Sequence, residues 1–269
     1  MKTNTITTKH VYSDQKQNTV FMKKNNETWT PINFQWIPVV KLNNQLNQKT
    51  NTMKKVVILP FLLALTLILS CSKDSISGSG DLTSESRTVT NFTKVKSEGV
   101  FEVMITQGND QSIQVIADDN IIHKVKTVVV DNELRIFLDD DDNYTNISVE
   151  VIITVPSING IKNFGIGHIL ALDIDTNDNF NVYNSGLGGI KIEGSASGLN
   201  LENEGSGTYE GFLFNANDCN VRIIGSGDCE INCANNLDVH IEGSGDVYYM
   251  GTPLIEADIS GSGNIVNAN

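Results

Sequence analysis

The sequence predicts an all-β fold: a right-handed parallel β-helix, or β-solenoid, with an irregular strand-rich cap at its N-terminal end. A glycine box that recurs at a nearly fixed interval indicates coils of one size. Apolar and polar residues alternate between the boxes, which is typical of strands. The boxes occupy positions 186–188, 205–207, 225–227, 243–245 and 261–263, and a looser copy lies at 165–167. Their spacing, about 20 residues from one box to the next, is typical of a solenoid repeat.

The last three repeats align without gaps, and equivalent positions share their polarity. The apolar rows are Cys219, Leu237 and Ile255; Val221, Val239 and Ala257; Ile223, Ile241 and Ile259; and, after the box, Cys229, Val247 and Ile265. Two polar rows run between them: Asn220, Asp238 and Glu256, and Arg222, His240 and Asp258. Successive coils stack ~4.8 Å apart, so each row predicts a column of like side chains, either inside the coil or on its surface.

The glycine boxes predict corners. A glycine is needed there either for a positive φ or because the backbones of successive coils approach closely. The serine between the glycines is expected to make local hydrogen bonds at the corner. The right-handed sense follows from the strong preference of crossover connections between parallel strands.

The N-terminal part of the chain predicts export and lipidation. Residues 53–70 combine a basic start, the apolar run 56–69 and a small residue before Cys71, as in a lipoprotein signal peptide too short to span a membrane. The sequence Ile-Leu-Ser-Cys at 68–71 resembles the bacterial lipobox, so Cys71 is the expected lipid attachment site; an ordinary signal peptide with an incidental cysteine is the alternative. Residues 1–52 are expected to be a mis-assigned start, with translation beginning at Met53, or a disordered extension.

The rest of the chain divides into a flexible tether, residues 71–90, and the solenoid domain, residues 91–269. Strands are predicted at 100–106, 112–117, 125–130, 133–138 and 147–155, with a tight hairpin at Asp131-Asn132. Residues 72–75, Ser-Lys-Asp-Ser, resemble the surface-export signal of Bacteroidetes lipoproteins. The predicted location is the cell envelope, at the outer membrane, with the periplasmic and outer faces both open.

The net charge limits the kinds of ligand that the chain is expected to bind, and the cysteine positions predict buried thiols. Residues 1–71 hold nine of the 19 Lys/Arg and two of the 32 Asp/Glu, so the remainder keeps ten basic and 30 acidic residues and a net charge near −20. This balance argues against nucleic acid and anionic lipid as direct partners, leaving the lipid anchor as the contact with the membrane. Cys219, Cys229 and Cys233 are expected to be buried thiols, with a Cys219–Cys233 bridge as the alternative.

No catalytic, cofactor or metal site is predicted. The acidic run 139–142, from Asp139 to Asp142, is expected to be a solvated turn, although calcium binding there stays open. The same interpretation applies to Asp173, Asp175 and Asp178, and to Asp228 and Asp246, whose glycine-aspartate boxes recur half as often as those of a calcium-binding β-roll. The chain has no nucleophile elbow and no His-Glu-x-x-His motif, and no helix follows the glycine boxes. His123, His168 and His240 are isolated in sequence, and His240 falls in an exposed row.

Several ordered motifs carry a family resemblance. They are Ser-Gly-Ser-Gly-Asp at 77–81, Arg-Thr-Val at 87–89, Phe92, Gly-Val-Phe-Glu-Val at 99–103, Ile-Thr-Gln-Gly at 105–108, Ile-Ile-Thr-Val-Pro at 152–156 and the Gly-Ser-Gly-Asp/Asn boxes. Over about 78–266 the chain resembles the "putative auto-transporter adhesin, head GIN domain" proteins, which are common as Bacteroidetes lipoproteins. The resemblance implies a β-helical domain with no established enzymatic activity. The chain departs from the pattern at 186–189, Gly-Leu-Gly-Gly, and at His168.

These observations predict a lipid-anchored β-solenoid of the cell envelope that acts as a non-catalytic adhesion or binding module for a glycan or protein. The alternatives are a carbohydrate-active enzyme built on a β-helix, a polysaccharide lyase or glycosidase, and a purely structural envelope protein. An enzyme requires close carboxylates on one flank. Arg222 beside Asp238, and Tyr248 as a sugar platform, are the sequence features that such a flank could use.

Overall fold

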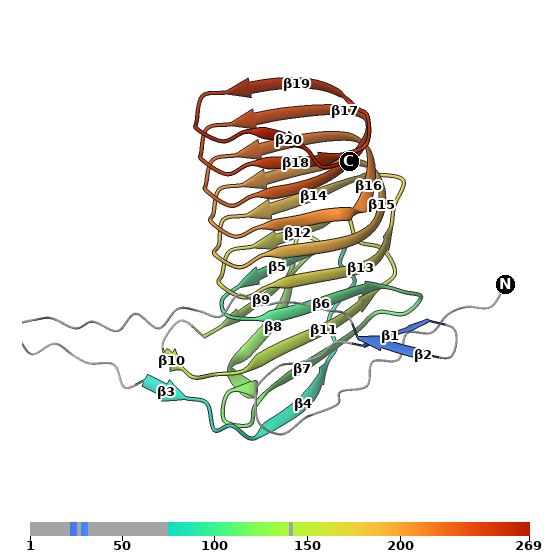
Figure 1. Cartoon of the computed structure of the whole chain (residues 1–269). Coiled ribbons are helices and arrows are strands. Elements are labelled where there is room, and N and C mark those ends of the chain that lie inside the picture. Colours follow the sequence, from blue (N-terminus) through green and yellow to red (C-terminus); the bar gives the residue numbers. More distant parts are fainter. Residues whose placement is uncertain (1–21, 26–27, 32–74, 140–141) are drawn as a thin grey trace, which may run out of the picture. The chain divides into compact units, whose positions relative to one another are not determined.

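The computed structural model describes residues 22–25, 28–31, 75–139 and 142–269, and its fold is all-β (Figure 1). The chain forms two compact units, residues 1–68 and 69–269. In the first, β1 (Met22–Asn25) and β2 (Thr28–Pro31) pair antiparallel. The described part of the second holds one short 3₁₀ turn, η1 (Ile122–Lys124), and otherwise only strands. None of the described residues belongs to a helix with the length and apolar character to cross a membrane.

Sixteen strands of the second unit form one mixed sheet, and two more, β3 and β10, pair separately. The strands are β3 (Ser75–Ser77), β4 (Leu82–Arg87), β5 (Lys94–Glu98), β6 (Glu102–Gln107), β7 (Ser112–Asp118), β8 (Val125–Val130), β9 (Glu133–Leu138), β10 (Asn143–Thr145), β11 (Val149–Val155), β12 (Gly160–Asn163), β13 (Ile169–Asp175), β14 (Asn179–Asn184), β15 (Ile190–Asn203), β16 (Tyr209–Ile223), β17 (Cys229–Ile241), β18 (Val247–Met250), β19 (Leu254–Ile259) and β20 (Ile265–Asn267).

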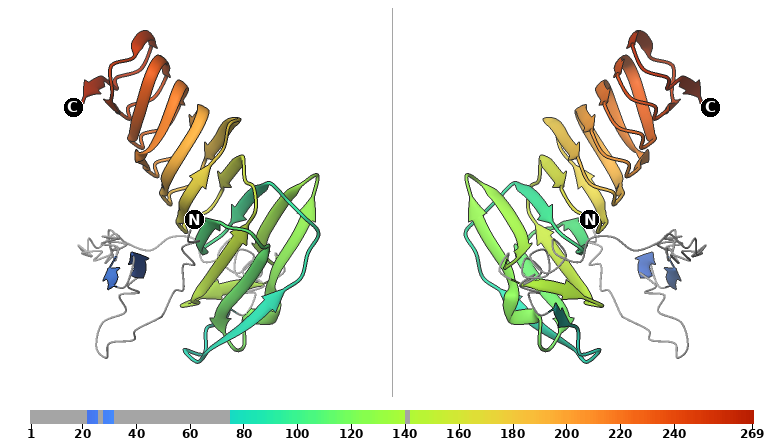
Figure 2. Two further views of the ribbon diagram at one scale, coloured as in Figure 1. Left: turned by 90° about the vertical axis from the view of Figure 1, so that its right-hand side faces the viewer. Right: turned by 90° about the vertical axis from the view of Figure 1, so that its left-hand side faces the viewer.

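From β12 onward the chain winds in stacked turns whose strands pair in parallel with those of neighbouring turns, and β5 with β6 and β9 with β11 extend the stack before β12 (Figures 1 and 2). Each turn contributes one strand to each of two faces. We name the first the amide face: β9, β5, β12, β14, residues 198–203 of β15, 218–223 of β16, 236–241 of β17, and β19. The second face holds β11, β6, β13, the first halves of β15, β16 and β17, β18 and β20.

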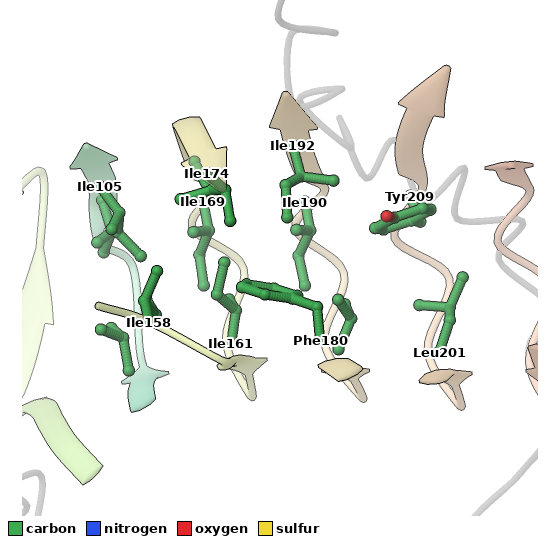
Figure 3. Close-up of a cluster of buried hydrophobic side chains, with 14 of the residues drawn as sticks. Ile105, Ile158, Ile161, Ile169, Ile174, Phe180, Ile190, Ile192, Leu201 and Tyr209 are labelled. Carbon is green, nitrogen blue, oxygen red and sulfur yellow. The ribbon is translucent and has the colours of Figure 1, made fainter. Parts of the chain in front are cut away.

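The rows predicted from the last three repeats are confirmed residue by residue. Val221 pairs with Val239 and Val239 with Ala257, and the flanking apolar and polar rows keep the same register. Cys229, Val247 and Ile265 align on the second face. Inside the stack, Ile169, Ile190 and Tyr209 from three successive turns lie in one row (Figure 3). The apolar row of β19 is exposed: Ile255 is 42% and Ile259 44% accessible.

The box glycines are required by contact between turns, not by positive φ. Among the described residues, glycines with positive φ are Gly80, Gly99, Gly194 and Gly251, none of them in a box. A Cβ on a box glycine would instead overlap the backbone of the preceding turn; at Gly225 it would stand 1.9 Å from the carbonyl oxygen of Gly205. The expectation of local serine hydrogen bonds is wrong at Ser226, whose Oγ donates to Ser206 Oγ, 3.0 Å away in the preceding turn.

A buried asparagine row supports the same corner. Asn163, Asn184 and Asn203 are fully buried, and they occupy equivalent positions in successive turns. The Nδ2 of Asn203 donates to the carbonyl oxygens of Gly207 at 3.0 Å and Gly227 at 3.1 Å, tying two turns together. In the next turn Ile223 takes this position. The sequence analysis did not identify this row, because polar residues were expected outside.

Strands outside the regular turns close the N-terminal end. β7 pairs antiparallel with β4 and β11, and β8 with β9. The predicted hairpin is confirmed, since Asp131 and Asn132 have φ values of 50° and 66° between β8 and β9. The predicted strands agree with β6, β7, β8, β9 and β11 to within two residues. Within the predicted tether 71–90, residues 75–77 and 82–87 form strands, so the described part of that segment is built into the fold.

Candidate binding groove

A hollow of about 500 Å³ lies on the amide face. It crosses five strands, β5, β12, β14, β15 and β16, at the N-terminal end of the stack. The residues at outward-facing strand positions that line it are Lys94, Gly160, Lys162, Asn181, Tyr183, Asn200, Glu202, Asn220 and Arg222.

Strand alternation places these side chains outside. Ile161, Val182 and Leu201 point into the core between them and are buried. Because the register is parallel, the outward residues form two rows along the stack. The first, which we name the amide row, runs Glu133, Lys94, Gly160, Asn181, Asn200, Asn220, Asp238, Glu256. The second, the charged row, runs Arg135, Lys96, Lys162, Tyr183, Glu202, Arg222, His240, Asp258.

The floor of the groove is made of short polar side chains. Asn200 Nδ2 donates to Asn181 Oδ1 at 3.0 Å, and Asn181 Nδ2 donates to the carbonyl oxygen of Asn159 at 3.2 Å. Gly160 contributes no side chain, and the atom nearest to where its Cβ would stand is Lys94 Cγ at 3.4 Å. The hollow therefore exists because one position in the row lacks a side chain and the asparagines that follow it have short side chains.

Ion pairs make the side of the groove rigid. Arg222 donates from Nη1 to Glu202 at 2.9 Å and from Nη2 to Glu242 at 2.5 Å. The hydrogen bonds from Arg222 and then His240 hold the pKa of Glu242 below its ordinary value, so this carboxylate stays ionised. Lys162 Nζ lies 2.7 Å from Glu133 Oε2. Apart from Glu133, these side chains are exposed enough for solvent to screen their charges, so the ion pairs fix the positions of the groups more than they stabilise the fold.

An aromatic pair lies beside the groove. The rings of Phe164 and Tyr183 have centroids 5.1 Å apart, and Lys96 Nζ lies 4.3 Å from the centroid of Phe164. Phe164 is 42% exposed, and Tyr183 donates its hydroxyl hydrogen to Glu204. Exposed aromatic rings next to amides are suited to bind the apolar face and the hydroxyls of the same ligand.

Among the described residues, the groove has one carboxylate in its lining, Glu202, and that carboxylate is paired with Arg222. Hydrolysis of a glycosidic bond needs two carboxyl groups facing one bond. The arrangement therefore provides hydrogen bonding, charge and stacking for a ligand.

Of the flank residues named from the sequence, Arg222 lies in the groove, but it pairs with Glu202 and Glu242 rather than with Asp238. His240 lies in the charged row beyond the groove lining, with Nε2 3.0 Å from Glu242 and Nδ1 3.2 Å from Asp258. Tyr248 lies in β18 on the second face, away from the groove.

The sequence analysis did not identify Tyr183 as the aromatic residue of the groove. The sequence signal that could have located the groove is the recurrence of Asn181, Asn200 and Asn220 at nearly the same interval as the glycine boxes. Each of these asparagines stands next to an apolar strand residue.

The aspartates of the glycine boxes have a structural role. Asp228 Oδ1 accepts the backbone N–H of Asp246 at 2.8 Å, and Asp246 Oδ1 accepts that of Asn264 at 2.7 Å. Each carboxylate thus accepts a hydrogen bond from the backbone of the equivalent residue one turn later.

At the edges of the acidic run, Asp139 lies 3.2 Å from Lys126 and Asp142 2.7 Å from Lys124. Residues 140–141 lie outside the described part of the chain. In that described part, no three His, Cys, Asp or Glu residues are grouped so that they could hold a metal ion.

The remaining candidates are dispersed. Asp175 accepts a hydrogen bond from Ser195 Oγ at 3.1 Å. His123 lies in η1, and His168 Nδ1 is 3.4 Å from Glu102. Cys219, Cys229 and Cys233 are free, buried thiols, as expected, and burial raises the pKa of Cys229 to about 12. Cys71 and the predicted signal peptide, residues 53–70, lie outside the described residues.

Comparison with known proteins adds solved relatives. A protein from Bacteroides fragilis NCTC 9343, described as a "putative adhesin", is 27% identical, with a TM-score of 0.60 over 72% of this chain and 100% of its own. A protein from Parabacteroides distasonis ATCC 8503, described as a "putative lipid binding protein", is 19% identical, with a TM-score of 0.50 over 73% of this chain and 100% of its own. The second shows likeness of fold alone. A search of curated proteins found no match.

A family model covers most of the second unit. The model described as "Putative auto-transporter adhesin, head GIN domain" matches residues 91–253, including both faces of the stack and all of the groove. That range is more than half of the chain. The chain therefore belongs to the "Putative auto-transporter adhesin, head GIN domain" family, as the sequence motifs indicated.

Proposed function

We propose that this chain is a non-catalytic adhesion module of the cell envelope that binds a glycan or protein on its amide face. We further infer that the stacked turns form a right-handed β-solenoid anchored at the outer membrane by a lipid on Cys71. The observation that carries the proposal is the groove itself: nine outward positions on five strands line one hollow. The family description supports a role at the cell surface.

A rigid stack suits this role physically. Parallel pairing fixes neighbouring turns ~4.8 Å apart, so the ligand-contacting groups are positioned before binding. Equivalent rows extend past the groove to Asp258 in the last strand of the face. A long ligand, or several copies of the protein on one cell, would add avidity to a modest single-site affinity.

The test of binding compares the full chain with a Tyr183→Ala/Asn200→Ala variant on a glycan array and on immobilised surface proteins. Both side chains point outward, so the fold should persist, as far-UV circular dichroism would verify. We expect the wild type to bind one ligand class and the variant to bind it at least tenfold more weakly, from the loss of one hydrogen-bonding and one stacking group. Equal binding by both proteins would refute the assignment of function to this face.

A carbohydrate-active enzyme is the competing function. Polysaccharide turnover by the full chain that disappears in Glu202→Gln would establish it and overturn the non-catalytic proposal. The single paired carboxylate in the described lining of the groove argues against that outcome.

The proposed anchor has a separate test. Cells expressing the chain would be grown with an alkyne-labelled fatty acid, and the protein from membranes would be examined for the label. We expect labelling of the wild type and none of Cys71→Ser. Labelled Cys71→Ser protein would contradict the attachment site, and peptides from residues 1–52 in these cells would contradict a start at Met53.

A further inference from the structure

The basic residues of the second unit are concentrated on the amide face. After residue 71 the chain has ten Lys and Arg against 30 Asp and Glu. Half of those basic residues occupy outward positions on this one face: Lys94, Lys96, Arg135, Lys162 and Arg222. On β9, β5 and β12, four of these basic side chains accompany two outward carboxylates, Glu98 and Glu133, so this end of the face keeps an excess of positive charge. A local cationic region on a strongly acidic protein attracts anions that the rest of the surface repels.

The charge changes along the amide row. Glu133 and then Lys94 begin it, amides follow at Asn181, Asn200 and Asn220, and the row ends with Asp238 and Glu256. The hollow covers the basic and amide segments and stops before Asp238. A ligand lying along it would meet a cationic end and a neutral middle.

Lys94 is available to a ligand. Glu133 stands opposite Lys94 on β9, but among the residues that the structure describes Lys94 makes no ion pair, in contrast to Lys96 and Lys162 in the neighbouring row. Its aliphatic stem lies against Gly160, where no side chain competes for the space. Lys162 Nζ forms an ion pair with Glu133 at 2.7 Å, but the Lys162 side chain is 43% exposed and can also contact an anionic ligand.

The neutral segment has unused hydrogen-bonding capacity. The side-chain amide of Asn220 makes no hydrogen bond within the described part of the chain, and that of Asn200 uses one donor. Consecutive amides recur at the ~4.8 Å strand spacing, which is close to the repeat of an extended chain of sugar rings. Each amide both donates and accepts, which matches vicinal hydroxyls.

The face is less suited to a peptide. Its strands pair on both sides over the groove, so no backbone edge is open for an added strand. The floor holds amides and a glycine, and the apolar residues in its lining, Ile161, Val182 and Leu201, are buried and point into the core, so they form no open apolar pocket for an aromatic anchor of a protein partner. The exposed Phe164–Tyr183 pair at the side offers ring faces to a sugar instead.

We propose that the groove binds an acidic oligosaccharide. Lys94 and Lys162 hold the carboxylate of a uronic acid unit, and the following rings lie along Asn181, Asn200 and Asn220. This inference rests on the proposed function of the amide face and specifies its ligand class.

The experiment titrates the full chain by calorimetry with three probes: trigalacturonate, its methyl ester and neutral galactotriose. The methyl ester keeps the rings and removes the charge. We expect trigalacturonate to bind at least tenfold more tightly than either neutral probe, and that preference to weaken with added salt. The Lys94→Gln/Lys162→Gln variant should lose the preference and retain the weak binding of neutral probes.

Lys126→Gln is the matched control, because it removes one exposed positive charge on β8, outside the groove. It should bind like the wild type. Trigalacturonate binding that is equal in wild type and Lys94→Gln/Lys162→Gln would overturn the proposal.

Two outcomes separate this inference from the proposed function. Equal binding of acidic and neutral probes, reduced by Asn200→Ala, or binding of a surface protein but no saccharide, would refute the acidic ligand and leave an adhesion module on this face. Absence of binding to any glycan or protein would refute both.

Discussion

Replacing Gly225 by alanine tests the central feature of the fold, the contact between glycine boxes of successive turns. The new Cβ would stand 1.9 Å from the carbonyl oxygen of Gly205 and 2.6 Å from that of Glu204. Both atoms belong to backbone, so no side-chain rotation can relieve the overlap. Gly225 does not have a positive φ, so the substitution introduces steric overlap rather than a strained backbone angle.

The expected loss of stability follows from the geometry. Relieving the overlap requires the two turns to separate by more than an ångström at the corner. That movement breaks the hydrogen bonds from the backbone N–H groups of Ser226 and Gly227 to the carbonyl oxygen of Gly205, now 3.1 and 3.3 Å long. Overpacking together with two lost hydrogen bonds costs about 3–5 kcal/mol, a large share of the stability of a domain.

Urea unfolding followed by far-UV circular dichroism measures this loss. Tryptophan fluorescence would not report on the second unit, because Trp29 and Trp36 both precede it. Gly160→Ala is the control, since its Cβ would meet Lys94 Cγ at an ordinary 3.4 Å, and its stability should change by no more than about 1 kcal/mol. An unfolding midpoint for Gly225→Ala equal to that of the wild type would refute the role assigned to the boxes.

Three further predictions use the same unfolding assay. Asn203→Ala should lower the free energy of unfolding by about 1–3 kcal/mol, because it leaves two corner carbonyls without their donor. Asn203→Ile, which places in this turn the residue of the next one, should lower it less, and the reverse order would contradict the role of the asparagine row. Asp246→Ala should lose about 1 kcal/mol and Asp246→Asn almost none, because Asn retains the acceptor for the backbone of Asn264; equal losses would point to charge instead. Burial raises the pKa of Glu98, but hydrogen bonds from Lys96 and Arg135 outweigh it and leave that pKa below 4.5. The ionised Glu98 carboxylate therefore stabilises the fold above pH 4.5, and this stabilisation is lost as the pH falls through the folded-state pKa. The free energy of unfolding of Glu98→Gln should fall less steeply with decreasing pH than that of the wild type, and identical pH dependence would exclude this linkage.

The sequence was sufficient for the part of the fold that repeats. Where successive turns have the same length, as from Val221 to Val239 to Ala257, each residue predicts the environment of the one stacked on it, and the structure agrees. The β8–β9 hairpin was predictable for a local reason, because Asp131 and Asn132 tolerate positive φ.

The buried asparagines could not be recognised from polarity. Alternation from Phe180 and Val182 places Asn184 inside, but a polar residue in a dry row normally indicates that the pattern has ended. What permits burial is the pair of glycine carbonyls that Asn203 reaches across two turns, and that contact exists only in the folded stack. These turns are also slightly longer than the last three repeats, so a gapless alignment does not extend to them.

The groove shows which surface features stacking explains and which it does not. Identical charges on consecutive strands repel one another, whereas amides can hydrogen-bond along a column, as Asn200 does with Asn181. A row of asparagines on a parallel stack is therefore accounted for by stability alone. Stability does not account for Lys94, which makes no ion pair among the described residues although Glu133 stands opposite it on β9. Nor does it account for the missing side chain at Gly160 or for the exposed ring of Phe164. These three features lie at the same end of one face, and the argument for a ligand depends on them rather than on the asparagines that first attract notice.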